Sequence, residues 1–218
     1  MKALLLVDLQ HDFLPGGALG VNNGGAIIPL INEMIHYPFD LIVATKDWHP
    51  ADHRSFASHH QGKKPGDIIH LGGIEQILWP DHCLQGAEGS EFAPGWDTTK
   101  IDKVIYKGTD PFIDSYSSFY DNGHRKQTGL ENYLREKGVQ QLFIAGLATD
   151  YCVKYSVLDA LKLGFRTYVI VDACRGVNLD PQDSEKALQD MRKGGAVLLS
   201  FRDLKELLEH DAKGKQTV

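Results

Sequence analysis

Cysteine is scarce in this sequence, which has only Cys83, Cys152 and Cys174 among its 218 residues. So few cysteines do not build the disulfide framework of small secreted domains, and the count indicates a reducing compartment, with the cytoplasm as the expected location. Long hydrophobic runs are missing as well. The N-terminal apolar run 3–7 stops at Asp8, which is too short for a signal peptide or a membrane span.

An excess of positive charge is also absent. The chain carries 23 Lys and Arg residues against 29 Asp and Glu residues, a net charge of -6, so we expect it to bind neither nucleic acid nor an anionic membrane. Apolar and charged residues make up 42% and 24% of the chain, which is ordinary for a globular protein. We expect one domain over residues 1–212 and a polar tail at 213–218, and the sequence leaves a homo-oligomer open.

What the sequence has is an alternation of apolar strands with amphipathic helices. Short aliphatic runs predict strands at 2–7, 39–45, 104–106, 142–145, 167–171 and 196–200. Helical spacing of apolar residues predicts helices at 24–35, 130–137, 150–163, 183–192 and 203–210. This order predicts an α/β fold, a three-layer α/β/α sandwich around a mostly parallel, doubly wound sheet of about six strands.

One segment, 47–101, interrupts the alternation. It is dense in Gly, Pro and His and shows little regular patterning. Loops of this length in compact domains are usually functional or disordered, and Trp48, Trp79 and Trp96 argue against disorder. We therefore expect a long ordered loop that serves the function.

Reactive side chains follow the predicted strands. Asp8, Asp47, Lys107 and Cys152 each come at or just after the end of an apolar run. The carboxyl ends of parallel strands share one edge of a sheet, and ligands bind in the crevice outside it, so these groups should be neighbours there. Burial would raise the pKa of Asp8 and Lys107 would lower it again, as suits a group that exchanges protons. The alternative is a structural ion pair.

Cys152 stands where a predicted strand gives way to a predicted helix. Thr149 or Asp150 could cap that helix, which would place Cys152 in its first turn. The unpaired N–H groups and the positive end of the helix dipole favour a thiolate over a thiol, so Cys152 is a candidate nucleophile. A small buried residue at a strand-helix junction is an equally good interpretation of its position alone.

Histidines gather in the long loop. Asp47 and His49 are two residues apart, so in an extended segment they point the same way and can bind one ion, with His82 as a third ligand. Two imidazoles and a carboxylate suit a divalent transition metal ion, and we favour zinc over iron(II) and manganese. The alternative is a set of surface histidines.

Aromatic residues stand beside these candidates. Phe13, Trp79 and Tyr151 each neighbour a candidate site residue and could form a slot for a flat ring. The alternative is packing in the core.

Five segments together resemble the nicotinamidase family of the isochorismatase-like cysteine hydrolases. They are Val-Asp-Leu-Gln-His-Asp-Phe (7–13), Asp-Trp-His-Pro (47–50), Trp-Pro-Asp-His-Cys (79–83), Lys-Gly (107–108) and Gly-Leu-Ala-Thr-Asp-Tyr-Cys-Val (146–153). No one of them is decisive, but they span most of the chain and come in the family's order.

The resemblance implies a role for each matching residue. It implies a catalytic triad of Asp8, Lys107 and Cys152. It also implies three metal ligands and a pair of ring-stacking residues: Asp47, His49 and His82, and Phe13 and Trp79. His53 matches a position that binds metal in some members only, and Leu147–Ala148 matches a cis peptide bond of relatives. Tyr151 stands where relatives vary, which leaves fine substrate preference open.

The expected reaction is hydrolysis of nicotinamide to nicotinate and ammonia through a cysteine thioester, with the oxyanion held by the N–H groups of Ala148 and Cys152. A similar ring amide, pyrazinamide, should also fit. The nearest alternative is a hydrolase of the same fold that acts on another small amide or carbamoyl compound. Isochorismatase activity has no use for Cys152, since hydrolysis of a vinyl ether calls for no such nucleophile. From another class, the chain could be a non-catalytic metal-binding or thiol-sensing protein.

Overall fold

The computed structural model describes residues 1–214, and within them the predicted three-layer fold is confirmed. Its central sheet has six strands, all parallel, in the order β5-β2-β1-β6-β7-β8. The strands are β1 (Lys2–Val7), β2 (Leu41–Asp47), β5 (Lys103–Lys107), β6 (Gln141–Leu147), β7 (Arg166–Arg175) and β8 (Val197–Leu199). The middle strands are buried on both faces, which explains their unbroken aliphatic runs.

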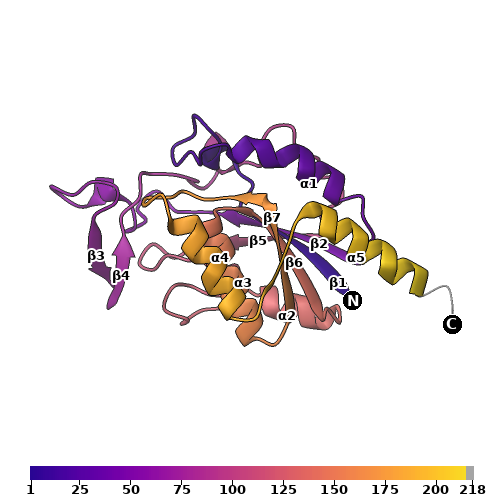
Figure 1. Cartoon of the computed structure of the whole chain (residues 1–218). Coiled ribbons are helices and arrows are strands. Elements are labelled where there is room, and N and C mark those ends of the chain that lie inside the picture. The colour runs from indigo at the N-terminus through magenta and orange to yellow at the C-terminus, as the bar shows by residue number, and fades with distance from the viewer. Residues whose placement is uncertain (215–218) are drawn as a thin grey trace.

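Helices cover both faces of this sheet. They are α1 (Ile28–Met34), α2 (Leu130–Glu136), α3 (Lys154–Lys162), α4 (Asp183–Lys193) and α5 (Phe201–Gly214). Figure 1 shows α1 and α5 on one face and α2, α3 and α4 on the other. The helix predicted at 24–35 begins as a 3-10 turn, Gly24–Ile27, before α1. Helix α5 takes in the first two residues of the predicted polar tail, and 215–218 lie outside the described residues.

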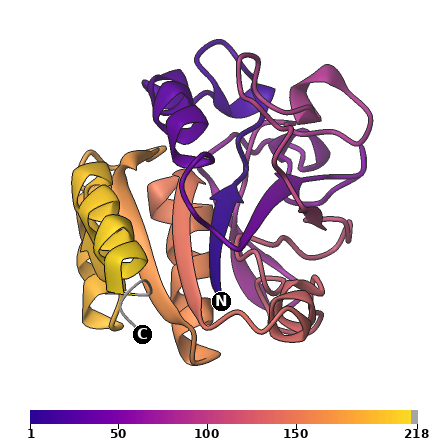
Figure 2. The ribbon, with the colours of Figure 1, turned by 90° about the vertical axis from the view of Figure 1, so that its right-hand side faces the viewer.

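The order of the strands in the sheet indicates where a ligand would bind. From β1 the chain moves to β2 on one side, whereas β6, β7 and β8 follow one another on the other side, so the order reverses between β1 and β6. The N-terminus lies at one end of the molecule (Figures 1 and 2), and the carboxyl ends of the parallel strands point to the opposite end. Crevices at such reversals bind ligands in open α/β sheets.

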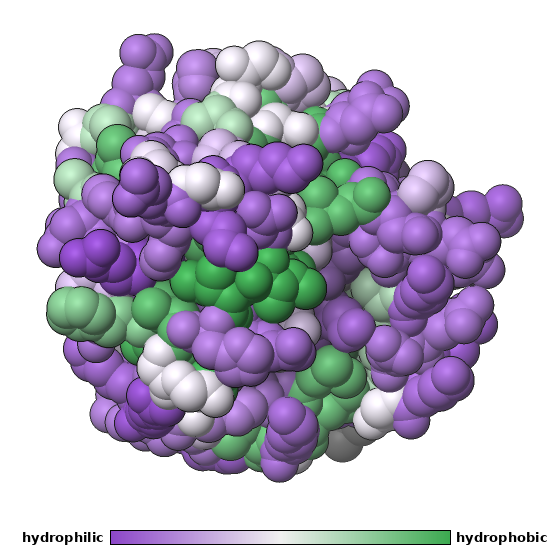
Figure 3. Space-filling model, turned by 90° about the vertical axis from the view of Figure 1, so that its left-hand side faces the viewer, coloured by the Kyte–Doolittle hydropathy of each residue, from purple (hydrophilic) through white to green (hydrophobic). Residues whose placement is uncertain are grey.

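A hairpin projects at that opposite end, inside the segment 47–101. Strands β3 (Ile68–Leu71) and β4 (Ile74–Ile77) pair antiparallel around Gly72 and Gly73. Both glycines have positive φ, +60° and +88°, as a two-residue hairpin turn of this type requires. The sequence patterning above did not predict these strands. On the molecular face at this end, a few hydrophobic side chains gather near the centre among hydrophilic ones (Figure 3).

Among the described residues, no helix is both long enough and apolar enough to cross a bilayer.

Candidate active site

Lys107 lies at the centre of the site. It ends β5 and is 1% exposed. Its Nζ lies 2.8 Å from Asp8 Oδ2 and 2.8 Å from Asp47 Oδ1, and it donates a hydrogen bond of 3.0 Å to the Ser115 carbonyl. Burial alone would lower the pKa of Lys107, but the carboxylates of Asp47 and Asp8 hold it well above its ordinary value. The ammonium therefore stays charged and balances two buried acids.

Asp8 is the acid that directly follows β1. It is fully buried and adopts a positive φ of 48°. The Thr45 hydroxyl donates to its Oδ1 at 2.5 Å. Burial raises the pKa of Asp8, and the opposing effect of Lys107 does not cancel the increase. The predicted tension between desolvation and a nearby cation is thus present, with desolvation the stronger.

Cys152 lies within reach of both groups. Lys107 Nζ donates to its Sγ at 3.3 Å, and the sulfur, one Asp8 oxygen and one Asp47 oxygen all lie within 4.8 Å of one another. Burial raises the pKa of the Cys152 thiol well above its ordinary value, and Lys107 only partly opposes this. The expected stabilisation of a thiolate by the helix start is therefore outweighed, and a base must remove the proton.

The turn that carries Cys152 begins differently from the expectation. A π-helical turn, Thr149–Val153, precedes α3, and neither Thr149 nor Asp150 caps it. The Asp150 carboxylate instead accepts hydrogen bonds from the N–H groups of Val177 (2.9 Å) and Asn178 (2.7 Å). The capping prediction was wrong because this carboxylate finds better-placed donors in the loop after β7.

Ala148 lies at the start of this turn. The peptide bond between Leu147 and Ala148 is cis, as the resemblance implies. The Ala148 carbonyl accepts from the N–H groups of Tyr151 and Val153, both at 3.1 Å. Ala148 and Cys152 thus belong to one tight turn beside the sulfur.

An aromatic pocket opens onto the sulfur. Its volume is about 20 Å³. All three predicted aromatic residues line it, together with residues of both candidate clusters and four that the sequence did not indicate: Phe13, Trp79, Tyr151, Asp47, His82, Cys152, Leu19, Asp114, Tyr116 and Val177. The last four come from loops without periodic patterning, so no local signal pointed to them.

The three predicted metal ligands converge beside this pocket. Asp47, His49 and His82 each offer one ligand atom, and these atoms all lie within 4.8 Å of one another. Each histidine forms a hydrogen bond from its Nδ1 to a backbone carbonyl oxygen. His49 Nδ1 lies 2.9 Å from the Gly108 carbonyl, and His82 Nδ1 lies 2.8 Å from the Pro80 carbonyl. A carbonyl only accepts, so each Nδ1 carries a proton, and in a neutral ring the lone pair available to a metal is on Nε2.

The Nε2 atoms of the two histidines face the same carboxylate oxygen of Asp47. Asp47 Oδ2 lies 3.3 Å from His49 Nε2 and 3.6 Å from His82 Nε2, whereas Oδ1 faces Lys107. In the part of the chain that the structure describes, His49 Nε2 is buried without a hydrogen-bond partner. Such a donor set fits a divalent cation. At Gly108 a Cβ would come within 2.4 Å of the His49 ring, so only glycine leaves the ring in place.

His53 lies next to this set. Its ring centroid is 4.4 Å from that of His49, and its buried Nε2 has no partner within residues 1–214. Burial lowers the pKa of His53 to about 4, which leaves the ring neutral and able to bind a metal. His49, His53 and Asp114 form a second group with ligand atoms within 4.8 Å. The geometry therefore keeps His53 open as a ligand.

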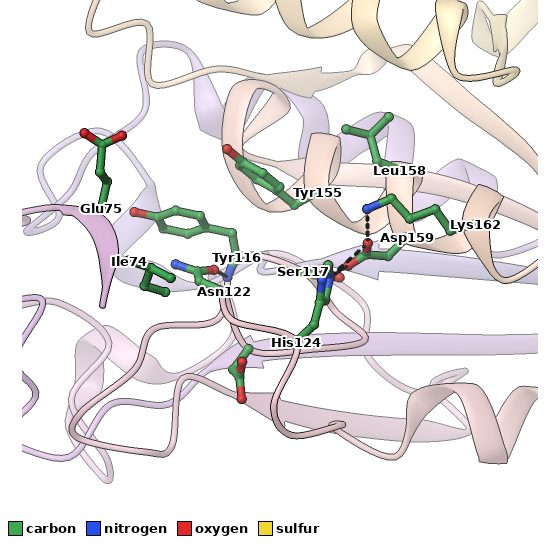
Figure 4. A pocket seen from close by; sticks show the side chains of 11 residues that line it. Ile74, Glu75, Tyr116, Ser117, Asn122, His124, Tyr155, Leu158, Asp159 and Lys162 are labelled. Carbon is green, nitrogen blue, oxygen red and sulfur yellow. Dashed lines mark hydrogen bonds and ion pairs between the residues drawn. The ribbon is translucent and has the colours of Figure 1, made fainter. Parts of the chain in front are cut away.

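A larger cavity of about 240 Å³ lies behind one wall of the aromatic pocket, between the hairpin and α3 (Figure 4). Tyr116 lines both spaces. In the larger cavity the Asp159 carboxylate is paired with His124 Nε2 at 3.0 Å and Lys162 Nζ at 3.1 Å. This cavity contains none of the three catalytic candidates, whereas the smaller pocket is lined by Cys152.

Known proteins are similar to this chain in sequence and in fold over most of its length. Residues 2–203 match the family model described as Isochorismatase domain. The chain is 47% identical over 208 residues to a nicotinamidase of Escherichia coli (strain K12), covering 94% of this chain and 97% of that protein. A structure of an Acinetobacter baumanii nicotinamidase and pyrazinamidase is 44% identical, with a TM-score of 0.90 over 93% of this chain and 97% of that one.

A further relative was solved in complex with zinc. It is the pyrazinamidase of Pyrococcus horikoshii, 39% identical, with a TM-score of 0.73 over 91% of this chain and 98% of that one. The family model, the sequence identities and the coverage all indicate the same family. The chain belongs to the nicotinamidase family of the isochorismatase-like hydrolases.

Proposed function

We propose that this protein hydrolyses nicotinamide to nicotinate and ammonia, and that it also accepts pyrazinamide. The observation that carries the proposal is the convergence of Asp8 and Lys107 on Cys152, which lines a tight aromatic pocket. Relatives that cover nearly the whole chain are named nicotinamidases, and one is also named a pyrazinamidase. Flat aromatic walls suit a small heteroaromatic ring better than a flexible substrate.

The proposed reaction begins with a proton transfer. Asp8 removes the proton of Cys152, and the sulfur attacks the carboxamide carbon to give a tetrahedral oxyanion. The N–H groups of Ala148 and Cys152 stabilise this oxyanion, and losing one such donor typically costs about 2.7–4 kcal/mol. Asp8 then protonates the departing nitrogen, so that ammonia leaves and a thioester remains. The raised pKa of Asp8 suits a group that accepts and returns a proton.

The thioester is cleaved by the reverse use of the same groups. Asp8 takes a proton from water, the hydroxide adds to the acyl carbon, and the sulfur leaves as a thiolate that regains the proton. Lys107 keeps its charge throughout and stabilises both the carboxylate and the sulfur anion. The acid that forms loses its carboxyl proton to water, nicotinate is released, and the site returns to its starting protonation.

Asp47, His49 and His82 would hold one divalent ion, with zinc favoured and iron or manganese as alternatives. When bound, the ion supplies a Lewis acid for the pyridine nitrogen, directly or through a water. The protein's own part would be to present the Nε2 atoms of two imidazoles and one carboxylate oxygen to the ion. A relative crystallised with zinc supports this assignment.

Release of ammonia from a panel of amides tests the proposed function. We expect turnover of nicotinamide and pyrazinamide, and turnover of benzamide at least about tenfold slower, because benzamide has no ring nitrogen for the ion. A coupled ammonia assay on the purified protein measures all three. If nicotinamide releases no ammonia while a ureido or carbamoyl compound does, the alternative hydrolase is correct.

Removing a metal ligand should empty the site. We expect Asp47→Ala to bind metal at least about 100-fold more weakly, because its Oδ2 faces both imidazoles. Elemental analysis after dialysis measures the metal per chain without reference to activity. Asp52→Ala, an exposed carboxylate of the same loop, is the control and should keep its metal. Full metal content in Asp47→Ala would contradict the ligand assignment.

A further inference from the structure

The β3–β4 hairpin is anchored at both of its ends. At the tip, Arg125 Nη2 donates to the Gly72 carbonyl. Near the base, the side chain of Gln76 points inward and is 1% exposed, whereas its neighbour Glu75 is exposed. Among the described residues the buried Gln76 oxygen has no hydrogen-bond partner, so the partners of its nitrogen indicate what the hairpin holds in place.

The Gln76 amide nitrogen meets three acceptors. Nε2 lies 2.7 Å from the Ile77 carbonyl, 3.3 Å from Asp114 Oδ2 and 3.1 Å from the Tyr116 hydroxyl. The Ile77 carbonyl and the Asp114 carboxylate can only accept hydrogen bonds. The amide nitrogen of Gln76, and not its oxygen, must therefore face these two groups. Two of these partners, Asp114 and Tyr116, line the catalytic pocket.

The Tyr116 hydroxyl passes this restraint to Trp79. It accepts from Gln76 Nε2 and from the indole Nε1 of Trp79, each at 3.1 Å. The rings of Trp79 and Tyr151 pack edge to face with centroids 4.9 Å apart, and Tyr116 lies 5.4 Å from Tyr151. One hydroxyl thus connects the hairpin to the aromatic wall that the proposed substrate ring would contact.

Tyr116 has space to move if this connection is lost. The cavity of about 240 Å³ lies behind its ring, and Figure 4 shows Tyr116 beside Asn122, with Ile74 and Tyr155 also on the cavity wall. Its backbone is held, since the Tyr116 N–H donates to Asn122 Oδ1 at 2.8 Å. On this side the ring packs against Tyr155, with centroids 5.4 Å apart, and the hydroxyl adds the directional contacts, to Gln76 and Trp79.

We propose that Gln76 is a positioning residue that fixes Tyr116, and through it Trp79, in the orientation that binds the substrate ring. This inference rests on the proposed function. The hairpin is then a part of the binding site that never touches the substrate. Because the restraint acts on the ring and not on the reacting carbon, it should strengthen the binding of substrate and transition state equally.

The test is steady-state kinetics of Gln76→Met with nicotinamide. Methionine has a similar length and no donor, so we expect KM to rise about tenfold with kcat within about twofold. Glu75→Gln, on the exposed side of the same strand, should leave both constants unchanged. Tyr116→Phe removes only the hydroxyl and should raise KM by a similar factor even if Gln76→Met folds poorly.

The double variant separates a connected network from two independent effects. If Gln76 acts through Tyr116, Gln76→Met combined with Tyr116→Phe should raise KM no further than either change alone. An unchanged KM in both single variants, a fall confined to kcat, or KM effects that multiply would overturn the inference while the wild type still turned over nicotinamide. A wild type that releases no ammonia from nicotinamide would overturn the proposed function itself.

Discussion

Replacing Cys152 by alanine should lower kcat for nicotinamide by at least about 10⁴-fold, since nucleophile removal in comparable covalent enzymes has effects of this size or more. In the reaction as proposed Cys152 is the nucleophile, whereas Asp8 transfers protons and Lys107 stabilises negative charge. Ammonia release at saturating nicotinamide measures the loss. The metal content of Cys152→Ala should stay unchanged, since the sulfur is not one of the proposed ligands.

A second buried cysteine provides the matched control. Cys174 is the penultimate residue of β7 and does not line the pocket, and its Sγ donates to the Ile170 carbonyl. Cys174→Ala should keep near wild-type turnover. Iodoacetamide adds a test of class, since an enzyme should be protected at Cys152 by nicotinamide and a thiol sensor should not. Ammonia release by Cys152→Ala at the wild-type rate would end the covalent mechanism.

Replacing Lys107 by methionine should remove activity and lower the free energy of unfolding by about 3–5 kcal/mol, the usual cost of leaving buried charges without a partner. The lysine is fully enclosed, and two carboxylates, Asp8 and Asp47, lie 2.8 Å from its nitrogen. Without it both acids must take up protons or stay buried and unpaired. Urea denaturation with a chelator present measures the change without a contribution from a bound ion.

Lys162 is the matched control for this prediction. It also pairs with a buried aspartate, Asp159, at 3.1 Å, but its own side chain is 67% exposed. Exposed ion pairs contribute about 0–1 kcal/mol, so Lys162→Met should change the free energy of unfolding by no more than that. Equal losses in the two variants would show that Lys107 has no special part in compensating the buried acids.

The positions of the proposed catalytic groups could be predicted because strand ends in a parallel sheet share one edge. Asp8 follows β1, Lys107 ends β5 and Cys152 follows β6, and each of these strands is an aliphatic run that can be read directly from the sequence. Strands β2 and β5 pair in a register that places Asp47 opposite Lys107. Fold class and hydrophobic period were sufficient for this much.

Other features depended on tertiary contacts. The hairpin does have a local signal, the Gly72–Gly73 pair between two Ile-containing segments, which a search for two-residue turns would have found. Tyr116 and Asp114 have none, because the loop that carries them takes its course from distant partners such as Gln76. The ionisation of Cys152 depends on burial, and a helix start alone says nothing of how deep the sulfur lies.

Since β5, β2, β1 and β6 stand next to one another in the sheet, groups from positions 8, 107 and 152 meet only when all four strands are in place. A fragment that lacks one of these strands cannot bring the three groups together as the sheet does. The proposed active site therefore forms only after residues far apart in the sequence have been assembled into one sheet.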